Sequence, residues 1–178
     1  RTQVGTDING TAIGSQVGSS VAINSAGTVI AVGMSGVNGN RGQVVVYRID
    51  NGSWTPVGSP IAGTASFTLE GTSVALSASG NTVMVGAEGY DNFRGRIRVF
   101  DLVSNTWTQR GADIVGDSVY QNLGTSMAMS ADASVLAYGV QHVCRYGGHG
   151  MISVRQWQGG QWTQRGGDFL ALSGDDGF

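Results

Sequence analysis

Short apolar runs separated by glycine-rich turns alternate along the whole chain, and none has the 3.6-residue spacing of an amphipathic helix. In the middle of the chain, the segment 73–77 alternates small polar with apolar residues, whereas 82–85 is almost continuously apolar. Alternation is typical of a strand with one buried face, and a continuous run is typical of a strand covered on both faces. The segment 96–100 is rich in β-branched and aromatic residues, and a further strand is expected from Trp107 onwards. The pattern therefore predicts four short strands, A to D in chain order, and essentially no helix.

Three copies of this four-strand unit follow one another. Each copy opens with a glycine before strand A, and these glycines lie 53 residues apart both times. A tryptophan recurs at strand D of every copy, which favours a packing role over a sugar-binding platform. A period of about 50 residues with four antiparallel strands is typical of the blades of a β-propeller. The repeated positions are Gly18, Gly71 and Gly124 before strand A, and Trp54, Trp107 and Trp162 in strand D.

We therefore expect an all-β fold of three consecutive four-stranded antiparallel blades. Residues 1–17 align with the end of a copy, so they are expected to form strand D and the linker of a preceding blade. The three blades are expected at residues 18–70, 71–123 and 124–178, the last with a truncated linker to a next blade. Three blades are fewer than the usual four to eight. We expect either a fragment of a ring with six to eight blades or a chain that self-associates to complete a ring.

The order of these motifs resembles the FG-GAP repeats of integrin alpha chains and their microbial relatives. The resemblance rests on Gly-x-Ser-Val-Ala, an apolar strand ending in glycine, and Gly-x-Val-x-Val-Tyr/Phe, and it covers nearly the whole chain. It implies a β-propeller whose D–A and B–C connections lie on one rim. The chain departs from the family at the Phe of the Phe-Gly motif, which is replaced by Val17, Glu70 and Leu123.

Neither calcium nor zinc is expected. Many members of the resembled family hold calcium with spaced acidic residues in the A–B hairpin, but the three matching hairpins here contain one carboxylate in total, Asp132. Calcium needs six to eight oxygen ligands. His142, Cys144 and His149 carry zinc-binding groups, but their spacing matches no standard ligand framework and a fourth ligand is missing. We therefore expect no metal and no cofactor.

Composition excludes several classes of function. Hydrophobic residues make up 40% of the chain, which argues against disorder. The net charge is −2 and no lysine occurs, whereas a surface that follows phosphates needs a basic excess, so nucleic acid is not an expected partner. No apolar run approaches 18 residues, so membrane insertion is not expected.

The long connections of the predicted rim are the candidate binding site, because recognition residues commonly lie on loops held by a rigid scaffold. The alternative is that these loops are only variable and solvated. The D–A loops are expected at 11–17, 64–70 and 117–123, and the B–C loops at 35–41, 88–94 and 141–149. The candidate ligand-binding residues on these loops are Asn38, Arg41, Glu88, Tyr90, Asp91, Asn92, Phe93, Arg94, Tyr120, His142, Arg145, Tyr146 and His149.

Arg94, Arg96 and Arg98 alternate along strand C of the second copy and therefore share one face. They could bind an acidic ligand. Solvation or pairing with internal acids such as Asp113 is the favoured interpretation.

No catalytic constellation is visible, so the chain is not expected to be an enzyme. Glycosidases need two carboxylates, and nothing in the sequence selects Glu88 with Asp91 or Asp117 as such a pair. We expect a binding or adhesion module for a protein or glycan, at the cell surface or outside the cell. A lectin-like propeller and part of a propeller hydrolase remain alternatives. A lectin should repeat one set of aromatic and polar residues in every blade, and these loops differ.

Overall fold

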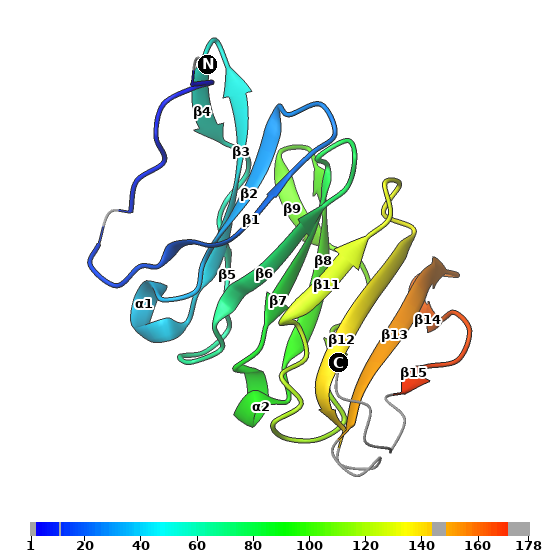
Figure 1. The fold of residues 1–178 in the computed structure, drawn as a ribbon. Coiled ribbons are helices and arrows are strands. Elements are labelled where there is room, and N and C mark those ends of the chain that lie inside the picture. Colours follow the sequence, from blue (N-terminus) through cyan, green and yellow to red (C-terminus); the bar gives the residue numbers. More distant parts are fainter. Residues whose placement is uncertain (1–2, 11, 144–148, 171–178) are drawn as a thin grey trace.

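The computed structural model describes residues 3–10, 12–143 and 149–170. These residues form three antiparallel sheets that follow one another in chain order (Figure 1). The first blade contains β1 (Val17–Ile23), β2 (Val29–Met34), β3 (Gln43–Asp50), β4 (Ser53–Pro56) and β5 (Ile61–Ala62). The second contains β6 (Glu70–Leu76), β7 (Thr82–Ala87), β8 (Arg96–Val103), β9 (Thr106–Gln109) and β10 (Ile114–Val115). The third contains β11 (Ser126–Met129), β12 (Val135–Val143), β13 (His149–Gln158), β14 (Gln161–Gln164) and β15 (Phe169–Leu170). The predicted all-β fold of three consecutive four-stranded blades is confirmed.

Strand D is divided in two in every blade. In the second blade β9 pairs with the far half of β8, and after a bend at residues 110–113 the short strand β10 pairs with its first two residues. The pairs β4/β5 and β14/β15 divide the edge of the other two sheets in the same way. The bend brings Asp113 beside the start of strand C, where Arg96 pairs with Val115. This position becomes important for the polar contacts between blades.

The prediction of essentially no helix is confirmed, because the two helical turns of the described residues, α1 (Val37–Asn40) and α2 (Tyr90–Phe93), are four residues long and contain left-handed dihedral angles. Two sequence expectations need correction. Residues 3–10, expected as a leading strand D, form no strand, since no strand C lies beside them in the described part of the chain. The B–C connection of blade 3 is shorter than expected, because β12 and β13 extend to Val143 and His149, which pair with each other.

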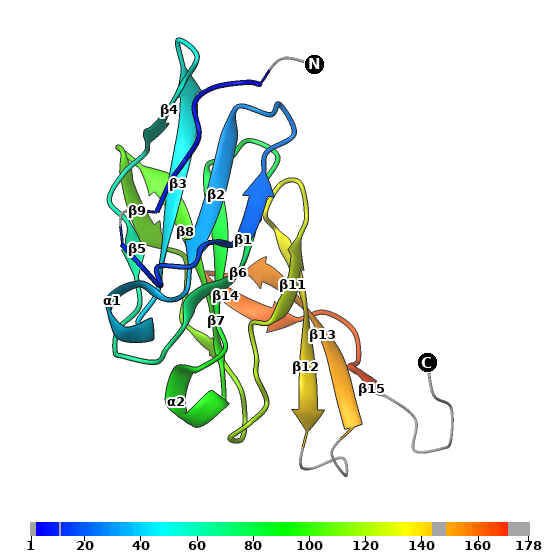
Figure 2. The same cartoon turned by 60° about the vertical axis from the view of Figure 1, so that its left-hand side comes forward.

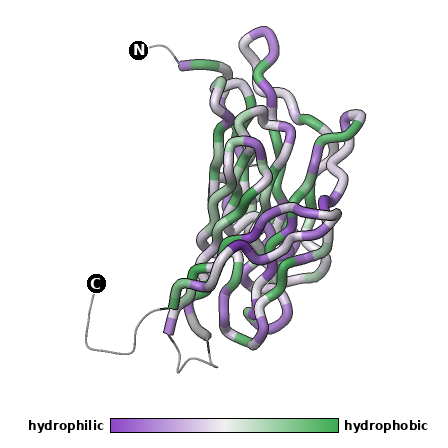
Figure 3. The backbone as a smooth tube through the Cα atoms, turned by 90° about the vertical axis from the view of Figure 1, so that its right-hand side faces the viewer, coloured by the Kyte–Doolittle hydropathy of each residue, from purple (hydrophilic) through white to green (hydrophobic). Residues whose placement is uncertain are grey.

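The hydrophobic core lies between the sheets. All six residues of β7 are buried, as expected for a strand covered on both faces. Val83 and Val85 pack into a cluster shared with blade 1, whereas Met84 packs with Leu136 of blade 3. Hydrophobic and hydrophilic residues alternate along much of the chain, as the colours of the backbone show (Figure 3). Among the described residues, no helix has the length and hydropathy of a membrane span.

Adjacent blades approach each other closely at glycine. A Cβ atom added to Gly33 would lie 2.1 Å from the Gly71 carbonyl oxygen, and one added to Gly86 would lie 2.1 Å from that of Gly124. The Ser20 hydroxyl donates to the Gly71 carbonyl at 2.8 Å, and Ser73 donates to Gly124 in the same way. The spacing between blades therefore depends on positions where no side chain fits.

The recurring tryptophans join the outer edges of the blades. Trp107 Nε1 donates to the Val57 carbonyl at 2.8 Å, and Trp162 Nε1 donates to the Arg110 carbonyl at 3.1 Å. Trp54 Nε1 donates to the Val4 carbonyl at 3.3 Å, so residues 3–10 run where the edge of a preceding blade would lie. Each tryptophan thus contacts the segment one repeat earlier in the chain.

The close approach of the blades predicts that substitution by alanine changes stability by different amounts at the equivalent positions Gly86 and Gly139. Gly86→Ala should lower the free energy of unfolding by about 2–3 kcal/mol, because the new methyl group cannot fit against the Gly124 carbonyl. Gly139→Ala is the matched control, because a Cβ there would meet only Ser126 Cβ at 3.7 Å, and it should change stability by less than about 0.5 kcal/mol. Urea unfolding of both variants measures the difference. Equal effects of the two substitutions would contradict this account of blade spacing.

Candidate functional site

The B–C turns and D–A loops gather at one rim, opposite the A–B hairpins (Figure 2). The backbone of this rim is unusual, because Asp91, Asn92 and Phe93 of α2 have φ values of 48°, 56° and 62°. Three consecutive L-residues in this region cost about 1–2 kcal/mol each. Such conformations persist only where surrounding contacts fix them.

Hydrogen bonds across the blade boundary fix this backbone. The carbonyl of Asn92 accepts from the Tyr120 N–H at 3.3 Å, and the carbonyl of Phe93 accepts from the Asn122 N–H at 2.8 Å. Between blades 1 and 2 the same bonds join Gly39 to Phe67 and Asn40 to Leu69. The rim side chains therefore project from a backbone that is held in place before any ligand binds.

Among the described residues of this rim, three aromatic side chains are exposed. The rings of Phe93 and Tyr120 are stacked, with centroids 6.2 Å apart and planes inclined by 14°. Phe93 is 43% exposed, Tyr120 is 64% exposed and Phe67 is 66% exposed. Phe67 and Phe93 line a shallow hollow of about 660 Å³ between residues 65–68 and 89–93. The rim thus offers apolar surface next to a concave area. Phe67 was not among the predicted site residues, although it lies within an expected D–A loop.

The predicted polar residues of the rim are mostly engaged within the chain. Arg94 pairs with the Asp91 carboxylate at 3.0 Å and donates through Nε to the Gly116 carbonyl at 2.8 Å. Arg41 donates to the Thr64 carbonyl at 3.3 Å. These contacts hold the rim together.

The remaining predicted rim residues of the first two blades differ in exposure. Asn38 and Asn92 are exposed, whereas Tyr90 is half-buried with its ring against the Arg96 guanidinium. Glu88 is half-buried too, and burial raises the pKa of its carboxyl above the ordinary value. Asp91 is engaged by Arg94, so the contacts give no support to a carboxylate pair with Glu88.

The candidate residues of blade 3 are only partly described. His142 lies in β12, and His149 is the first residue of β13. Cys144, Arg145 and Tyr146 lie outside the described residues. Within the described ranges, no three His, Cys, Asp or Glu side chains come close enough together to hold a metal ion.

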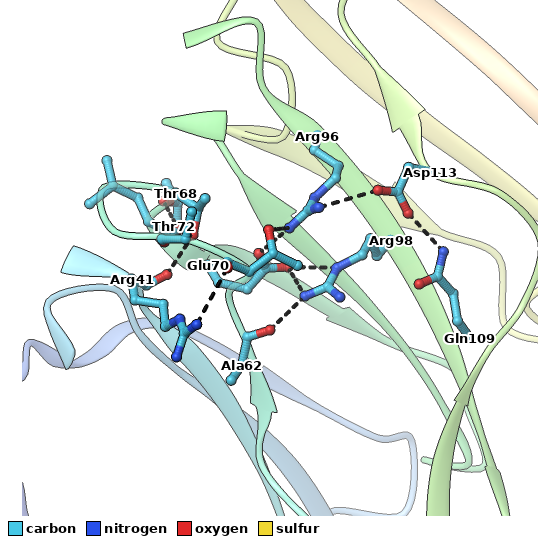
Figure 4. Close-up of polar contacts among 12 residues, drawn as sticks. Arg41, Ala62, Thr68, Glu70, Thr72, Arg96, Arg98, Gln109 and Asp113 are labelled. Atoms are coloured by element: carbon cyan, nitrogen blue, oxygen red, sulfur yellow. Dashed lines mark hydrogen bonds and ion pairs between the residues drawn. The ribbon is translucent and has the colours of Figure 1, made fainter. Parts of the chain in front are cut away.

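A buried ion cluster fills the boundary between blades 1 and 2 (Figure 4). Glu70 is completely buried, and its carboxylate accepts from Arg96 at 2.9 Å and from Arg98 at 2.7 Å. Arg96 also pairs with Asp113 at 3.2 Å, and its guanidinium lies 4.1 Å from the centroid of the Tyr90 ring. The expected pairing of Arg96 with Asp113 is therefore present. The side chains of Arg96 and Arg98 are 3% and 11% exposed, so this part of the arginine stripe is internal.

Glu70 is the residue that the sequence interpretation missed. It occupies the repeat position of Val17 and Leu123, and no resemblance predicts a charge there. A signal was nevertheless present, because the only copy with an acid at this position is also the copy with two arginines in strand C. The equivalents of Arg96 and Arg98 are Gln43 and Val45 in blade 1, and Met151 and Ser153 in blade 3.

The A–B hairpin of blade 3 uses its carboxylate to close its own turn. Asp132 Oδ1 accepts from the Ser130 hydroxyl at 2.6 Å and from the Ser134 N–H at 3.0 Å. The Ser134 hydroxyl adds a further bond at 2.8 Å to Oδ2. These donors stabilise the ionised form and lower the pKa of Asp132 to about 2.

The buried ion cluster predicts that stability lost on replacing Glu70 alone is regained when all three cluster positions carry the residues found in blade 3. Glu70→Leu alone should lower the free energy of unfolding by about 3–5 kcal/mol, because two nearly buried arginines lose their common counter-ion. The triple variant Glu70→Leu, Arg96→Met and Arg98→Ser should recover most of this loss, since apolar replacement of a complete buried cluster is often neutral. Chemical denaturation tests both variants. The account is wrong if the single variant is as stable as the wild type, or if the triple variant is no better than the single one.

The Asp132 turn predicts a pH dependence with a definite sign. A carboxyl whose pKa is lowered by folding contributes stability above its unfolded pKa, near 4, and loses it as the pH falls towards about 2. A carbon-detected NMR titration should give this low pKa, and Ser130→Ala should raise it because the first hydrogen-bond donor is lost. Ser118→Ala, in a loop of the opposite rim, should leave it unchanged. An ordinary aspartate pKa in the wild type would contradict the turn geometry.

Comparison with known proteins supports the fold and goes no further. No protein-family model matches the sequence, and no curated protein matches it. Among solved structures, the chain is similar to the β-propeller domain of the trilobed protease of Pyrococcus furiosus, with 10% identity and a TM-score of 0.53 over 86% of this chain and 42% of that one. It is also similar to TolB of Acinetobacter baumannii, with 14% identity and a TM-score of 0.52 over 85% of this chain and 31% of that one. Hydrazine synthase of Kuenenia stuttgartiensis gives 14% identity and a TM-score of 0.56, over 85% of this chain and 36% of that one. The chain thus spans less than half the length of these structures, and its three sheets are consecutive blades of a β-propeller fold.

Proposed function

We propose that this chain is the binding part of a non-catalytic propeller, and that it recognises another protein through the rim of B–C turns and D–A loops. In this proposal the protein works at the cell surface or outside the cell, and its open blade faces pack against further blades or a second copy. An FG-GAP-type repeat without calcium agrees with the order of the motifs and with the use of Asp132 inside its own turn.

The observation that carries the proposal is the exposed aromatic pair of Phe93 and Tyr120. Aromatic residues dominate the binding energy of protein interfaces when they are central and well supported. Both residues have left-handed backbone, with φ of 62° at each, and hydrogen bonds between blades hold this backbone. Such an arrangement lowers the ordering cost on binding, because little conformational freedom remains to be lost. The hollow beside Phe93 and Phe67 gives a partner side chain a place to insert.

A protein partner is favoured over a glycan because the rim differs from blade to blade. At the position of Phe93, blade 1 has Asn40, and at the position of Tyr120 and Phe67 the leading segment has Gly14. The stacked aromatic pair therefore occurs only at the boundary between blades 2 and 3 in the described part of the chain. One asymmetric patch suits a single protein epitope better than a repeated sugar pocket.

A selection experiment tests the proposed rim. Peptides selected from a displayed random library against the wild-type chain should bind at least about tenfold more weakly to Phe93→Ala and to Tyr120→Ala, because each truncation removes a central aromatic contact. The circular dichroism spectra and melting temperatures should stay close to wild type, since both side chains are exposed. Affinity is measured with the synthesised peptides in solution.

Val103→Ala is the matched control, because Val103 is 54% exposed and lies at the end of β8 away from the B–C turn. It should leave peptide affinity unchanged. A glycan array is screened in parallel with the same proteins. If the selected peptides bind Phe93→Ala and Tyr120→Ala as tightly as the wild type, the rim is not a protein-binding site. Binding of a glycan that is lost in these two variants would support the lectin alternative instead.

A further inference from the structure

The boundary between blades 2 and 3 contains a small polar hollow at the place where blades 1 and 2 hold their ion cluster. Its volume is about 230 Å³, and Leu123, Met151 and Ser153 line it where Glu70, Arg96 and Arg98 lie one repeat earlier. These side chains are shorter or apolar, so the space that two guanidinium groups fill in one boundary is left open in the next. A hollow of this size suits a small headgroup rather than a drug-sized molecule.

The filled boundary shows what such a position accepts. Arg96 donates through Nη1 to Asp113 Oδ2 at 3.2 Å, and through Nη2 to Glu70 Oε2 at 2.9 Å and to Thr64 Oγ1 at 3.4 Å. Arg98 adds a bond to the Ala62 carbonyl at 2.9 Å. The chain thus binds the two terminal nitrogens of this guanidinium with a carboxylate of the D–A bend, a side-chain oxygen of the D–A loop and a buried acid, whereas Arg96 Nε has no partner within the described residues.

One of these acceptors, the carboxylate of the D–A bend, recurs between blades 2 and 3 without the guanidinium. Asp168 occupies the position of Asp113, and Gln164 donates to its Oδ1 at 2.8 Å, as Gln109 donates to Asp113 Oδ1 at 2.8 Å. In blade 2 the other oxygen, Oδ2, accepts from Arg96. In blade 3 the residue at the arginine position is Met151, which has no donor to offer. The Asp168 carboxylate is therefore held by its glutamine as the Asp113 carboxylate is, but no arginine side chain at position 151 donates to its second oxygen.

A buried hydroxyl in the hollow points to the same missing group. Ser153 is only 2% exposed and lines the hollow, and its hydroxyl makes no hydrogen bond within the described part of the chain. A guanidinium in the hollow would supply the donor, since it carries five N–H groups and accepts none.

The one cationic residue of the lining is engaged within the chain. Arg155 occupies the position of Phe100 in the filled boundary and donates through Nε to the Tyr138 hydroxyl at 2.9 Å. Within the described part of the chain Asp168 forms no ion pair, so its carboxylate is available to a cation in the hollow.

We infer that this hollow binds a guanidinium group from outside the chain, either on a small molecule or on an arginine side chain of a partner. The Asp168 carboxylate is its main ion-pair partner, and the Ser153 hydroxyl accepts a second hydrogen bond. Arg96 in the neighbouring boundary is the internal counterpart of this ligand. The inference is independent of the aromatic rim.

Calorimetric titration with two pairs of probes tests this inference. Butylguanidine should bind saturably and at least about tenfold more tightly than pentylamine, because only the planar guanidinium matches the fixed acceptors. A capped Gly-Arg-Gly peptide, compared with Gly-Lys-Gly, shows whether an arginine side chain is also accepted. Binding of the small probe without the peptide assigns the site to a free ligand, and binding of both admits a protein source.

Variants locate the binding. Asp168→Asn should weaken butylguanidine binding at least about tenfold, whereas Asp7→Asn, in the equivalent Gln–Asp pair outside the hollow, should leave it unchanged. Met151→Arg should place a guanidinium in this hollow, as Arg96 does in the neighbouring boundary. It should therefore abolish butylguanidine binding although Asp168 is still present. Absence of saturable binding to the wild type, or unchanged binding to the correctly folded Asp168→Asn and Met151→Arg variants, would overturn the inference.

Discussion

The close approach of backbone between neighbouring blades is the constraint on which the rest of the structure depends. At Gly33 and Gly86 the carbonyl oxygen of the next blade occupies the volume of a missing side chain. This spacing lets the B strands be covered on both faces, so β7 is buried along its whole length. It also brings the D–A loop of one boundary close enough to hydrogen-bond the B–C turn beside it. The left-handed turns of the rim are stable because this contact exists.

The side chains at equivalent positions of the two blade boundaries differ in charge and size. Between blades 1 and 2 a buried acid and two arginines fill the space, and between blades 2 and 3 the replacement of all three leaves a hollow. A complete buried ion cluster contributes little net stability, because desolvation of the charges offsets their attraction. The repeat can therefore exchange ionic for apolar residues at this place while the hydrogen bonds and glycines that set the spacing stay the same.

The sequence predicted the architecture well because the architecture depends on a period. Glycines 53 residues apart and the apolar run at 82–85 were enough to predict blades and a doubly covered strand B. The left-handed turn at Asp91 to Phe93 could not be predicted, since its conformation depends on hydrogen bonds to residues about 30 positions later and local propensity opposes it. The expected arginine stripe was partly internal for a related reason. Glu70, the first residue of β6, holds Arg96 and Arg98 of β8 in place, and only the folding of the sheet brings these distant residues together.

Native-state hydrogen exchange measured by NMR tests the central claim most directly. The amide of Leu123 donates to the Arg94 carbonyl across a blade boundary, and the amide of Val85 lies within one blade at its core. If blade spacing holds the structure together, both amides should exchange only through global unfolding and with the same free energy of opening. Exchange of Leu123 at a free energy several kcal/mol below that of Val85 would show that blades separate while each stays folded, and would contradict the account.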